Sequence, residues 1–473
     1  MAVVIKTFAT PGGKYVYDRE TMSLLSVNDA EFEVCKRIEV GEANDEDWKI
    51  VERYTQQGYL KETKLKKIEH GATRYMRHNL DSRISQLTMQ VTQGCNLRCS
   101  YCAYGGNYEN QRTHSNKSMS LEMMKKCVDF AMARSRGVDV LTFGFYGGEP
   151  LLEIENIKAC VAYIKDVYRG RGVSYTITTN GTIFNDDMIQ FFEENDISIL
   201  ISLDGPKHIH DRNRIFENGQ GSFDKIMENL LYIRENCPSF FGKIGFTTVV
   251  APGDDFSCVN EYFDASDVIS ENRASYSTVS SYSAKEDIWY DDAYIMTYKY
   301  NHMKVLLAAL GLSDKKTLSK LFLTNMGDVE RFYDYLSKIP IAEAAHPGGP
   351  CLPGVMRPFV SIDGSIYPCE RLSEDSEAMK IGHIDTGFDM DKVNAALNVG
   401  KLTEAECMSC WIFQRCGLCL GACDGGDKLS KEVRLKNCES QIYNTLDQLK
   451  TICLLMENGY DFRYKFSLSE RQV

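Results

Sequence analysis

Three cysteines stand close together in the segment Gln93-Gly-Cys-Asn-Leu-Arg-Cys-Ser-Tyr-Cys102. Their spacing, C-x3-C-x2-C, offers three thiolates, whereas each iron of a 4Fe-4S cluster needs its own ligand. One iron would therefore remain open to another molecule. The motif follows an alternating apolar run, residues 86–91, which predicts a strand, so the cluster would lie on a loop at a strand's carboxyl end. The alternative is a zinc site, but zinc usually pairs C-x2-C with a second cysteine pair, and no such pair lies nearby in the sequence.

Residues 147–150, Gly-Gly-Glu-Pro, end the next predicted strand about fifty residues later. Glycines there leave the main chain open to a ligand, although the same four residues also make an ordinary turn. Together the two motifs resemble the radical SAM superfamily, whose CxxxCxxC motif has an aromatic residue, here Tyr101, before its third cysteine. The resemblance implies that S-adenosylmethionine (SAM) binds the open iron and is cleaved to a 5′-deoxyadenosyl radical that abstracts hydrogen. It also implies that Gly147 and Gly148 contact the SAM amino group and that Glu149 fixes the turn.

Two later segments resemble further parts of the same superfamily. Ser202 and Asp204 follow a predicted strand and could contact SAM, or they could be turn residues in a run that contains Asp-Gly-Pro. Asp211 and Arg214 follow, and this arginine could pair with a carboxylate in a forked geometry or form a surface ion pair. The expected cofactor-binding residues are Tyr101, Gly147, Gly148, Glu149, Ser202, Asp204 and Arg214.

The C-terminal region carries a second concentration of cysteines. They are Cys351, Cys369, Cys407, Cys410, Cys416, Cys419, Cys423 and Cys438. The pattern C-x12-G-x4-C, then C-x2-C-x5-C, resembles the SPASM domain, which holds two auxiliary 4Fe-4S clusters. The family's next cysteine would fall at Leu420, whereas this chain has cysteines at 419 and 423.

The SPASM resemblance implies three 4Fe-4S clusters in all, together with SAM. Cys407, Cys410, Cys416 and Cys438 would hold the outer auxiliary cluster, and Cys351, Cys369 and one or both of Cys419 and Cys423 the inner one. If only one of the last two binds, the inner cluster keeps an iron open to a substrate thiolate. A pair of structural zinc sites is the alternative. The remaining cysteines, which fall in amphipathic patterns, are expected to be core residues: Cys35, Cys127, Cys160, Cys237, Cys258 and Cys453.

The elements that must position these residues fall into four regions. Residues 1–80 begin with three short strands and two helices, which predict a winged-helix-like module, and residues 61–77 read as a linker or a solvated helix. Residues 85–285 alternate strands and helices, which predicts an α/β fold with a parallel sheet. The resemblance makes this sheet a partial (β/α)6 barrel. The pattern of residues 286–345 predicts a helical bridge, with helices at 294–310 and 316–336. By the resemblance, residues 346–473 are expected to form the cysteine-rich SPASM domain.

Composition narrows the function classes further. A net charge of −12 disfavours non-specific binding to nucleic acid. No apolar stretch predicts a membrane span, and the first residues do not resemble a signal peptide, so we expect a cytoplasmic protein. In that compartment 17 cysteines favour metal binding over disulfides.

SPASM enzymes act largely on peptides, and residues 1–80 resemble the recognition element that binds the leader of a ribosomally made precursor (RiPP) peptide. The whole chain thus resembles the sactipeptide and ranthipeptide maturases, which form thioether bridges in cysteine-rich precursors and take electrons from a flavodoxin- or ferredoxin-type reductant. Carbon–carbon crosslinking, or formylglycine formation as in anaerobic sulfatase-maturing enzymes, is the alternative within this chemistry. From another class, the chain could be a non-catalytic iron–sulfur electron carrier or a peptide-binding scaffold.

Overall fold

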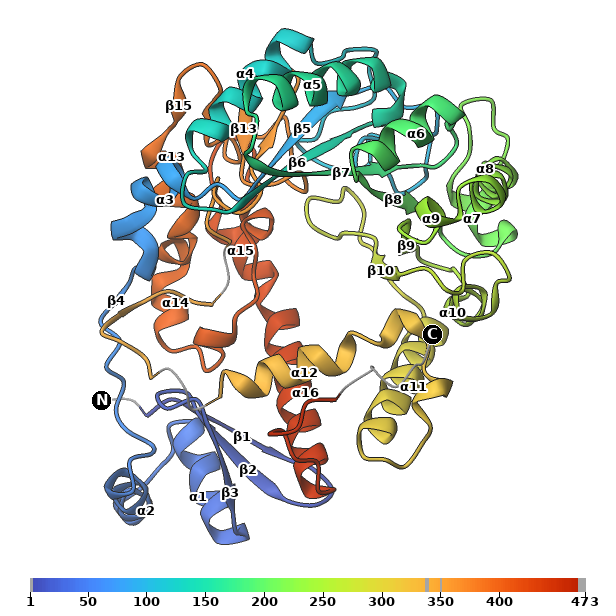
Figure 1. Ribbon diagram of the computed structural model, residues 1–473. Coiled ribbons are helices and arrows are strands. Elements are labelled where there is room, and N and C mark those ends of the chain that lie inside the picture. Colours follow the sequence, from blue (N-terminus) through green and yellow to red (C-terminus); the bar gives the residue numbers. More distant parts are fainter. Residues whose placement is uncertain (1–2, 337–339, 349–350, 467–473) are drawn as a thin grey trace.

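A computed structural model describes residues 3–336, 340–348 and 351–466 (Figure 1). The chain begins with an antiparallel sheet in the order β1 (Ile5–Ala9), β2 (Lys14–Asp18) and β3 (Ser23–Val27). Two helices, α1 (Asp29–Glu39) and α2 (Asp45–Gln56), follow it, each capped by an asparagine and closed by a reciprocal capping box. These elements lie close to their predicted bounds. They enclose a small core of Ile5, Val16, Val34, Cys35, Ile38, Val51 and Leu60.

Residues 61–77, expected to be a linker or a solvated helix, do not form one solvated helix. This segment instead contains the short strand β4 (Lys67–Ile68), which pairs with β11 (Ala344–Ala345), and the turn η1 (Gly71–Tyr75), which leads into helix α3 (Met76–Ser82). Its apolar residues Leu65 and Ile68 are buried against Phe413 of the C-terminal region. Two buried apolar side chains in a basic segment are enough to fix it to the rest of the protein.

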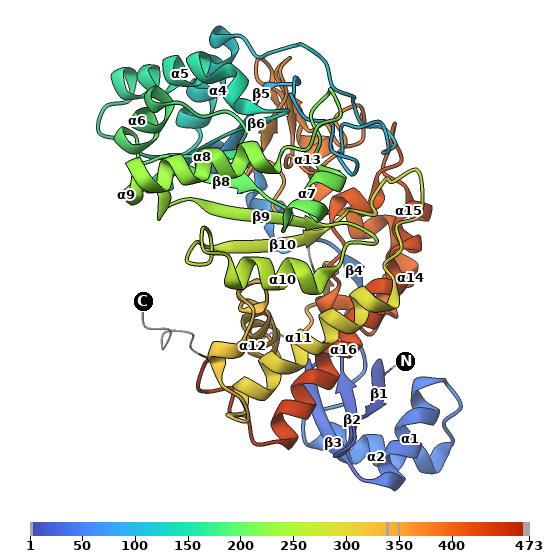
Figure 2. The same ribbon diagram turned by 90° about the vertical axis from the view of Figure 1, so that its right-hand side faces the viewer.

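The middle of the chain, residues 86–278, forms a parallel sheet. Its strands lie in the order in which they occur in the chain: β5 (Gln86–Thr92), β6 (Val140–Gly147), β7 (Gly172–Thr179), β8 (Ser198–Ser202), β9 (Gly245–Val250) and β10 (Ala274–Thr278). The helices between them are α4 (Leu121–Ala133), α5 (Ile154–Val167), α6 (Asp186–Glu194), α7 (Lys207–Asn213), α8 (Phe223–Asn236), α9 (Pro238–Phe241) and α10 (Phe256–Ala265). Figure 2 shows several of these helices along the outside of the sheet. The alternating pattern predicted the strands and the helices α4, α5, α6 and α8, but not α7, α9 or α10.

The sheet continues into the C-terminal region, which the sequence did not indicate. β12 (Phe359–Val360) pairs in parallel with β5, and β13 (Ser365–Tyr367), β14 (Gly382–His383) and β15 (Gly387–Phe388) follow it as antiparallel strands. The whole sheet has the order β10-β9-β8-β7-β6-β5-β12-β13-β14-β15. Strands of two or three residues are too short for an alternating pattern to predict them.

Between the sheet and the cysteine-rich region lie α11 (Asp292–Ala309), the turns η3 (Lys315–Thr317) and η4 (Lys320–Phe322), and α12 (Asn325–Asp334). The predicted helix at 316–336 is therefore correct only in its second half. In the first half, the side chains of Asp314 and Ser319 accept hydrogen bonds from the main chain two residues further on. Such local bonds compete with a continuous helix.

Most cysteines of the C-terminal region lie in the segments between short elements. The short elements are α13 (Met390–Leu397), η5 (Val399–Thr403), α14 (Glu404–Met408), η6 (Phe413–Arg415), η7 (Leu420–Cys423) and α15 (Lys431–Lys436), before the long helix α16 (Cys438–Glu457). α16 runs back to the N-terminal sheet (Figure 1), where the hydroxyls of Thr10 and Tyr15 donate to Glu457. No helix in the described part of the chain combines the length and apolar character needed to span a membrane.

The N-terminal sheet is fixed firmly to the cysteine-rich region. The Arg19 side chain is fully buried, and its Nη1 donates to the Met408 carbonyl over 2.7 Å while its Nη2 pairs with Glu20 over 2.5 Å. The Tyr17 ring packs edge-on against Trp411, with 5.9 Å between ring centroids. Because Met408 lies between Cys407 and Cys410, residues 17–20 directly support the loop that carries these two cysteines.

Candidate functional site

The three cysteines of the first motif lie together on the loop that follows β5. Cys95, Cys99 and Cys102 are partly buried free thiols, and the charges on them interact with one another. Burial raises the pKa of Cys95 to about 11 and that of Cys99 to about 12. Several thiolates buried close together cost free energy unless cations bind among them. The irons of a cluster are such cations. The donor set therefore fits a 4Fe-4S cluster with one iron left for another ligand.

The Gly-Gly-Glu-Pro turn lies directly against this loop. A Cβ added to Gly147 would lie 2.1 Å from the Thr92 oxygen, and one added to Gly148 would lie 2.0 Å from the Gly94 oxygen and 3.1 Å from the Cys95 nitrogen. The main-chain nitrogen of Gly148 donates to Thr92 over 2.9 Å. Only glycine allows this contact, which ties the end of β6 to the start of the cysteine loop.

Glu149 is fully buried and holds the turn in place. Its carboxylate accepts hydrogen bonds from the main-chain nitrogens of Leu151 (3.0 Å) and Asn180 (2.7 Å) and from the Thr179 hydroxyl (2.7 Å). Burial raises the pKa of Glu149 to about 7. The carboxylate thus joins the ends of β6 and β7 on the side of the sheet where the cysteine loop lies.

Sequence reasoning missed two asparagines beside the cysteine loop. Asn180 Nδ2 donates to Asn96 Oδ1 over 2.7 Å, and Asn96 Nδ2 donates to the Thr182 hydroxyl over 2.8 Å. The same Asn180 amide also approaches the Cys95 sulfur at 4.0 Å. Their signal was present in the sequence, because Asn96 lies inside the cysteine motif and Asn180 ends a strand.

Tyr101, Asp204 and Arg214 form one buried network. The Tyr101 hydroxyl donates to Asp204, Arg214 Nε donates to Asp204 Oδ2 over 2.8 Å, and the Val249 main chain donates to Asp204 Oδ1 over 3.0 Å. Arg214 pairs with Asp204 and not with Asp211, which accepts instead from the Phe223 main chain. This network holds the tyrosine that precedes the third cysteine.

The remaining predicted cofactor residue, Ser202, is half-buried as the last residue of β8. It pairs with Thr247 of β9 in the strand register. It thus ends its strand at the same edge of the sheet as the Asp204 network.

His210 supports the network from below and is neutral. It is fully buried, its Nδ1 accepts from the Asp204 main chain over 3.2 Å, and its Nε2 lies 2.9 Å from the Ser222 oxygen. The Ser222 hydroxyl already donates to the Arg214 carbonyl, so Nε2 must carry the hydrogen. Burial lowers the pKa of His210 to about 4.

We therefore expect folding stability to fall as the pH drops from about 6.5 to about 4, because only the unfolded chain then gains a proton at His210. The pKa difference corresponds to at most about 3 kcal/mol. Thermal unfolding followed across this range should show a shallower acid decline in His210→Gln than in the wild type. His208→Gln, an exposed neighbour, serves as the control and should keep the wild-type slope. Equal slopes in all three proteins would contradict the assignment.

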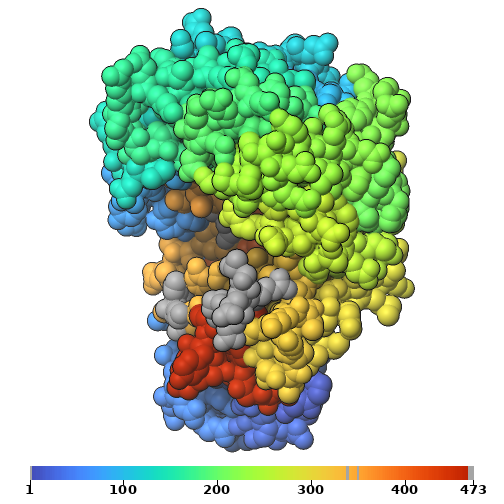
Figure 3. All heavy atoms as spheres, turned by 45° about the vertical axis from the view of Figure 1, so that its right-hand side comes forward, coloured from blue at the N-terminus to red at the C-terminus, as the bar shows by residue number. Residues whose placement is uncertain are grey.

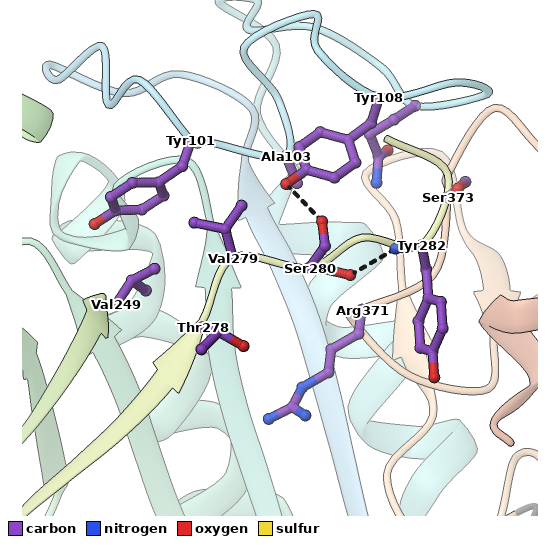
Figure 4. A pocket seen from close by; sticks show the side chains of 11 residues that line it. Tyr101, Ala103, Tyr108, Val249, Thr278, Val279, Ser280, Tyr282, Arg371 and Ser373 are labelled. Carbon is purple, nitrogen blue, oxygen red and sulfur yellow. Dashed lines mark hydrogen bonds between the residues drawn. The ribbon is translucent and has the colours of Figure 1, made fainter. Parts of the chain in front are cut away.

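A pocket of about 180 Å³ opens beside this network (Figure 4). Tyr101, Ala103 and Tyr108 of the cysteine loop line one side of it. Thr278, at the end of β10, and Tyr282, just beyond, line another, and the C-terminal region contributes Arg371 and Ser373. The Tyr108 hydroxyl donates to the Ser280 carbonyl over 3.2 Å, which joins two walls of the pocket.

The C-terminal cysteines separate into two sets. Cys407, Cys410, Cys416 and Cys438 interact electrostatically with one another. The thiol charge of Cys419 interacts with those of both Cys351 and Cys369. This proximity groups Cys419 with Cys351 and Cys369. The assignment of the two groups to clusters stays a prediction.

Cys423 lies between the two sets. Its thiol charge interacts with those of Cys419 and Cys416, and its sulfur accepts from buried Arg434 over 3.4 Å. Among the described residues, no three or more His, Cys, Asp or Glu side chains are arranged to hold a single metal ion. A 4Fe-4S cluster does not require its ligands to converge on one ion, because each thiolate binds its own iron.

Tyr282 connects the pocket to these cysteines. Its ring lines the pocket and packs against the buried cluster of Ile412, Cys416, Leu418 and Ala422. Its charge interacts with those of Cys416, Cys419 and Cys423. The pocket thus lies between the cysteine loop after β5 and the auxiliary cysteines. Of the other cysteines, Cys35, Cys127, Cys160 and Cys453 are buried, whereas Cys237 and Cys258 are only half-buried.

Comparison with known proteins agrees with this geometry. Residues 89–265 match the model of the radical SAM superfamily. This segment is a radical SAM domain. It contains all three cysteines of the first motif, the Gly-Gly-Glu-Pro turn and the Asp204 network.

Several curated proteins are similar to this chain. A cysteine-type anaerobic sulfatase-maturating enzyme from Clostridium novyi is 39% identical over 150 residues, 31% of this chain and 39% of that enzyme. One from Clostridium perfringens is 26% identical over 366 residues, 72% of this chain and 88% of that enzyme. The radical SAM cyclopropyl synthase TigE from Paramaledivibacter caminithermalis is 23% identical over 42% of this chain and 43% of TigE. The chain spans only 39%, 53% and 34% of the first three curated relatives.

The solved structure of native anSMEcpe with bound AdoMet has the same overall fold. The match has a TM-score of 0.57 at 19% identity and covers 78% of this chain and 99% of that chain. A second structure of that protein, with AdoMet and the Cp18Cys peptide, gives a TM-score of 0.56 at 20% identity. Nearly all of that fold therefore has a counterpart here, and about a fifth of this chain lies outside the match.

Proposed function

We propose that the protein is a radical SAM oxidoreductase that acts on a cysteine-containing peptide and joins a peptide cysteine sulfur to carbon in a thioether crosslink. The observation that carries the proposal is the pocket walled by Tyr101 on one side and by Tyr282 and Arg371 on the other. A substrate in this pocket lies between the cysteine loop of the radical SAM domain and the auxiliary cysteines. Thioether formation removes two electrons from the peptide. It therefore needs both the cysteine loop and the auxiliary cysteines.

The residues present fit three 4Fe-4S clusters and SAM. Cys95, Cys99 and Cys102 would hold the first cluster, where bound SAM supplies a 5′-deoxyadenosyl radical that removes one hydrogen atom from the substrate. The outer and inner auxiliary sets would hold the other two, which supply an acceptor for the second electron. The protein itself keeps the first loop rigid through the Gly148 contact and the Asp204 network.

The partner that we propose is a cysteine-rich precursor peptide whose leader binds the N-terminal sheet. β1 and β3 are the outer strands of that sheet, and an outer strand can accept an extended peptide. Arg19 donates to the Met408 carbonyl, so a bound leader would lie on a unit that contacts the outer auxiliary set directly. A flavodoxin- or ferredoxin-type protein is the proposed source of electrons.

Formylglycine formation is the second candidate, because two of the relatives described above are named cysteine-type anaerobic sulfatase-maturating enzymes. The two reactions leave different products. A thioether crosslink removes two hydrogen atoms and keeps the sulfur in the peptide, whereas formylglycine formation removes the sulfur and leaves an aldehyde.

The deciding experiment combines the anaerobically reconstituted protein, SAM, a strong reductant and candidate cysteine-rich precursor peptides encoded near its gene. We expect deoxyadenosine, and a peptide that has lost two hydrogen atoms per crosslink and no longer reacts with a thiol-alkylating reagent. Loss of sulfur together with an aldehyde would favour formylglycine formation. If no deoxyadenosine forms at all, the chain is an electron carrier or a binding scaffold, and the proposed chemistry is wrong.

A further inference from the structure

β10 is the last strand of the central sheet and has an unpaired outer edge. It pairs in parallel with β9 through all five of its residues, and the opposite end of the sheet is the two-residue strand β15. Figure 2 shows β10 below β9, with α10, α11 and α12 beneath it. The unpaired edge of a five-residue strand can form main-chain hydrogen bonds with another extended chain.

The main-chain groups that face this edge follow from the hydrogen bonds to β9. The Phe246 nitrogen donates to the Arg273 oxygen over 2.8 Å, so Arg273 points toward β9. Because successive residues of a strand point their main-chain groups in opposite directions, Ala274, Tyr276 and Thr278 point outward. In the ranges that the structure describes, no hydrogen bond reaches these outward N–H and C=O groups.

Tyr290 ends the pairing of β10 with β9 just beyond Thr278. Its hydroxyl accepts from the Val279 nitrogen over 2.9 Å and donates to the Val250 oxygen over 2.8 Å. The chain then turns away, and Thr278, Val279, Ser280 and Tyr282 line the pocket beside Tyr101. The free edge of β10 therefore leads directly to that pocket.

A cleft of about 510 Å³ runs along the free edge. All five residues of β10 line it, opposite Tyr294 and Tyr298 of α11 and Asn325 and Asp328 of α12. Thr278 lines both this cleft and the pocket beside Tyr101. Figure 3 shows a hollow in this side of the molecule, with the yellow-green chain around β10 on its rim.

We propose that the substrate peptide binds in this cleft as an additional strand on β10, which places its reactive residue beyond Thr278 in the catalytic pocket. This inference rests on the proposed function, because it assumes a peptide substrate. Outward N–H and C=O groups at alternate positions match the main chain of an extended peptide and of no other common ligand class. Binding through the main chain also tolerates varied side chains next to the reactive residue.

The first test is affinity selection from a synthetic library of eleven-residue peptides with a central cysteine and random flanks. The immobilised protein is reconstituted with its clusters and SAM. Strand addition requires the N–H of every second peptide residue, so we expect proline to be depleted at alternate positions over about five residues on one side of the cysteine. Proline tolerated equally at all positions would overturn the inference.

The second test changes β10 itself. Ala274→Pro removes an outward N–H and leaves the bonds to β9 intact, and Ala274→Ser is the matched control that keeps the N–H. We expect peptides selected on the wild type to bind Ala274→Pro about fivefold more weakly, the effect of one net hydrogen bond, and Ala274→Ser unchanged. Equal binding by both variants would contradict strand addition.

Deoxyadenosine formation without peptide separates the two proposals. It is measured on the reconstituted wild type, because SAM cleavage without peptide does not depend on how a peptide would be held. Normal deoxyadenosine formation together with a failed proline pattern would refute the β10 site and leave the proposed function standing. Absence of deoxyadenosine in the wild type would refute the proposed function itself.

Discussion

Cys99→Ala is expected to abolish deoxyadenosine formation and to remove about four irons per chain. Cys99 is the middle residue of the motif, and its charge interacts with those of both Cys95 and Cys102. Two thiolates cannot hold a cluster that needs one ligand on each of three irons. Iron and sulfide content after anaerobic reconstitution, with deoxyadenosine assayed on the same sample under a strong reductant, provides the measurement.

Cys258→Ala is the matched control for this change. Cys258 lies half-buried on α10, outside all three sets, and its thiol interacts only with acidic neighbours. We expect this variant to keep about twelve irons and full deoxyadenosine formation. A Cys99→Ala protein that still cleaves SAM would show that the cysteine loop is not the site of the chemistry.

Gly148→Ala should reduce deoxyadenosine formation by about a hundredfold or more, because small displacements in an active site have effects of that size. The added methyl group would lie 2.0 Å from the Gly94 oxygen and 2.5 Å from its carbonyl carbon. Both atoms belong to the main chain, so the cysteine loop and the end of β6 must move apart.

Gly71→Ala provides the matched comparison, because nothing lies within 4 Å of the position that its Cβ would take. This variant should keep the wild-type rate and iron content. Iron content also separates two ways in which Gly148→Ala could act. Full iron with slow SAM cleavage indicates a damaged SAM site, and loss of about four irons indicates a displaced loop. A wild-type rate in Gly148→Ala would show that the close contact is not needed.

The sequence predicted well those features that depend on local patterns. A capping asparagine and apolar spacing located α1, and apolar spacing located α2. Alternating apolar runs located the parallel strands. Helix α10 could have been found in the same way, because Asp255 caps it and Phe256, Val259 and Phe263 repeat at helical spacing.

Features that depend on contacts between residues far apart in the sequence could not be predicted from local patterns. Nothing near Arg214 in the sequence shows that its partner is Asp204 and not the closer Asp211. The same holds for Cys419, whose grouping with Cys351 and Cys369 arises from the folding of the C-terminal region. Spacing singled out these cysteines as candidate ligands, and the tertiary structure shows which of their thiols lie near one another.

The pairing of β12 with β5 has a consequence for how the protein is made. β5 leads into the cysteine loop, yet one of its two neighbours in the sheet begins at Phe359, beside Thr88. During synthesis the ribosome must release most of the chain before β5 can be flanked on both sides. Until then its open side is a surface on which nascent chains can pair with one another. We therefore expect the cysteine loop to take its final position only after the C-terminal region has been translated.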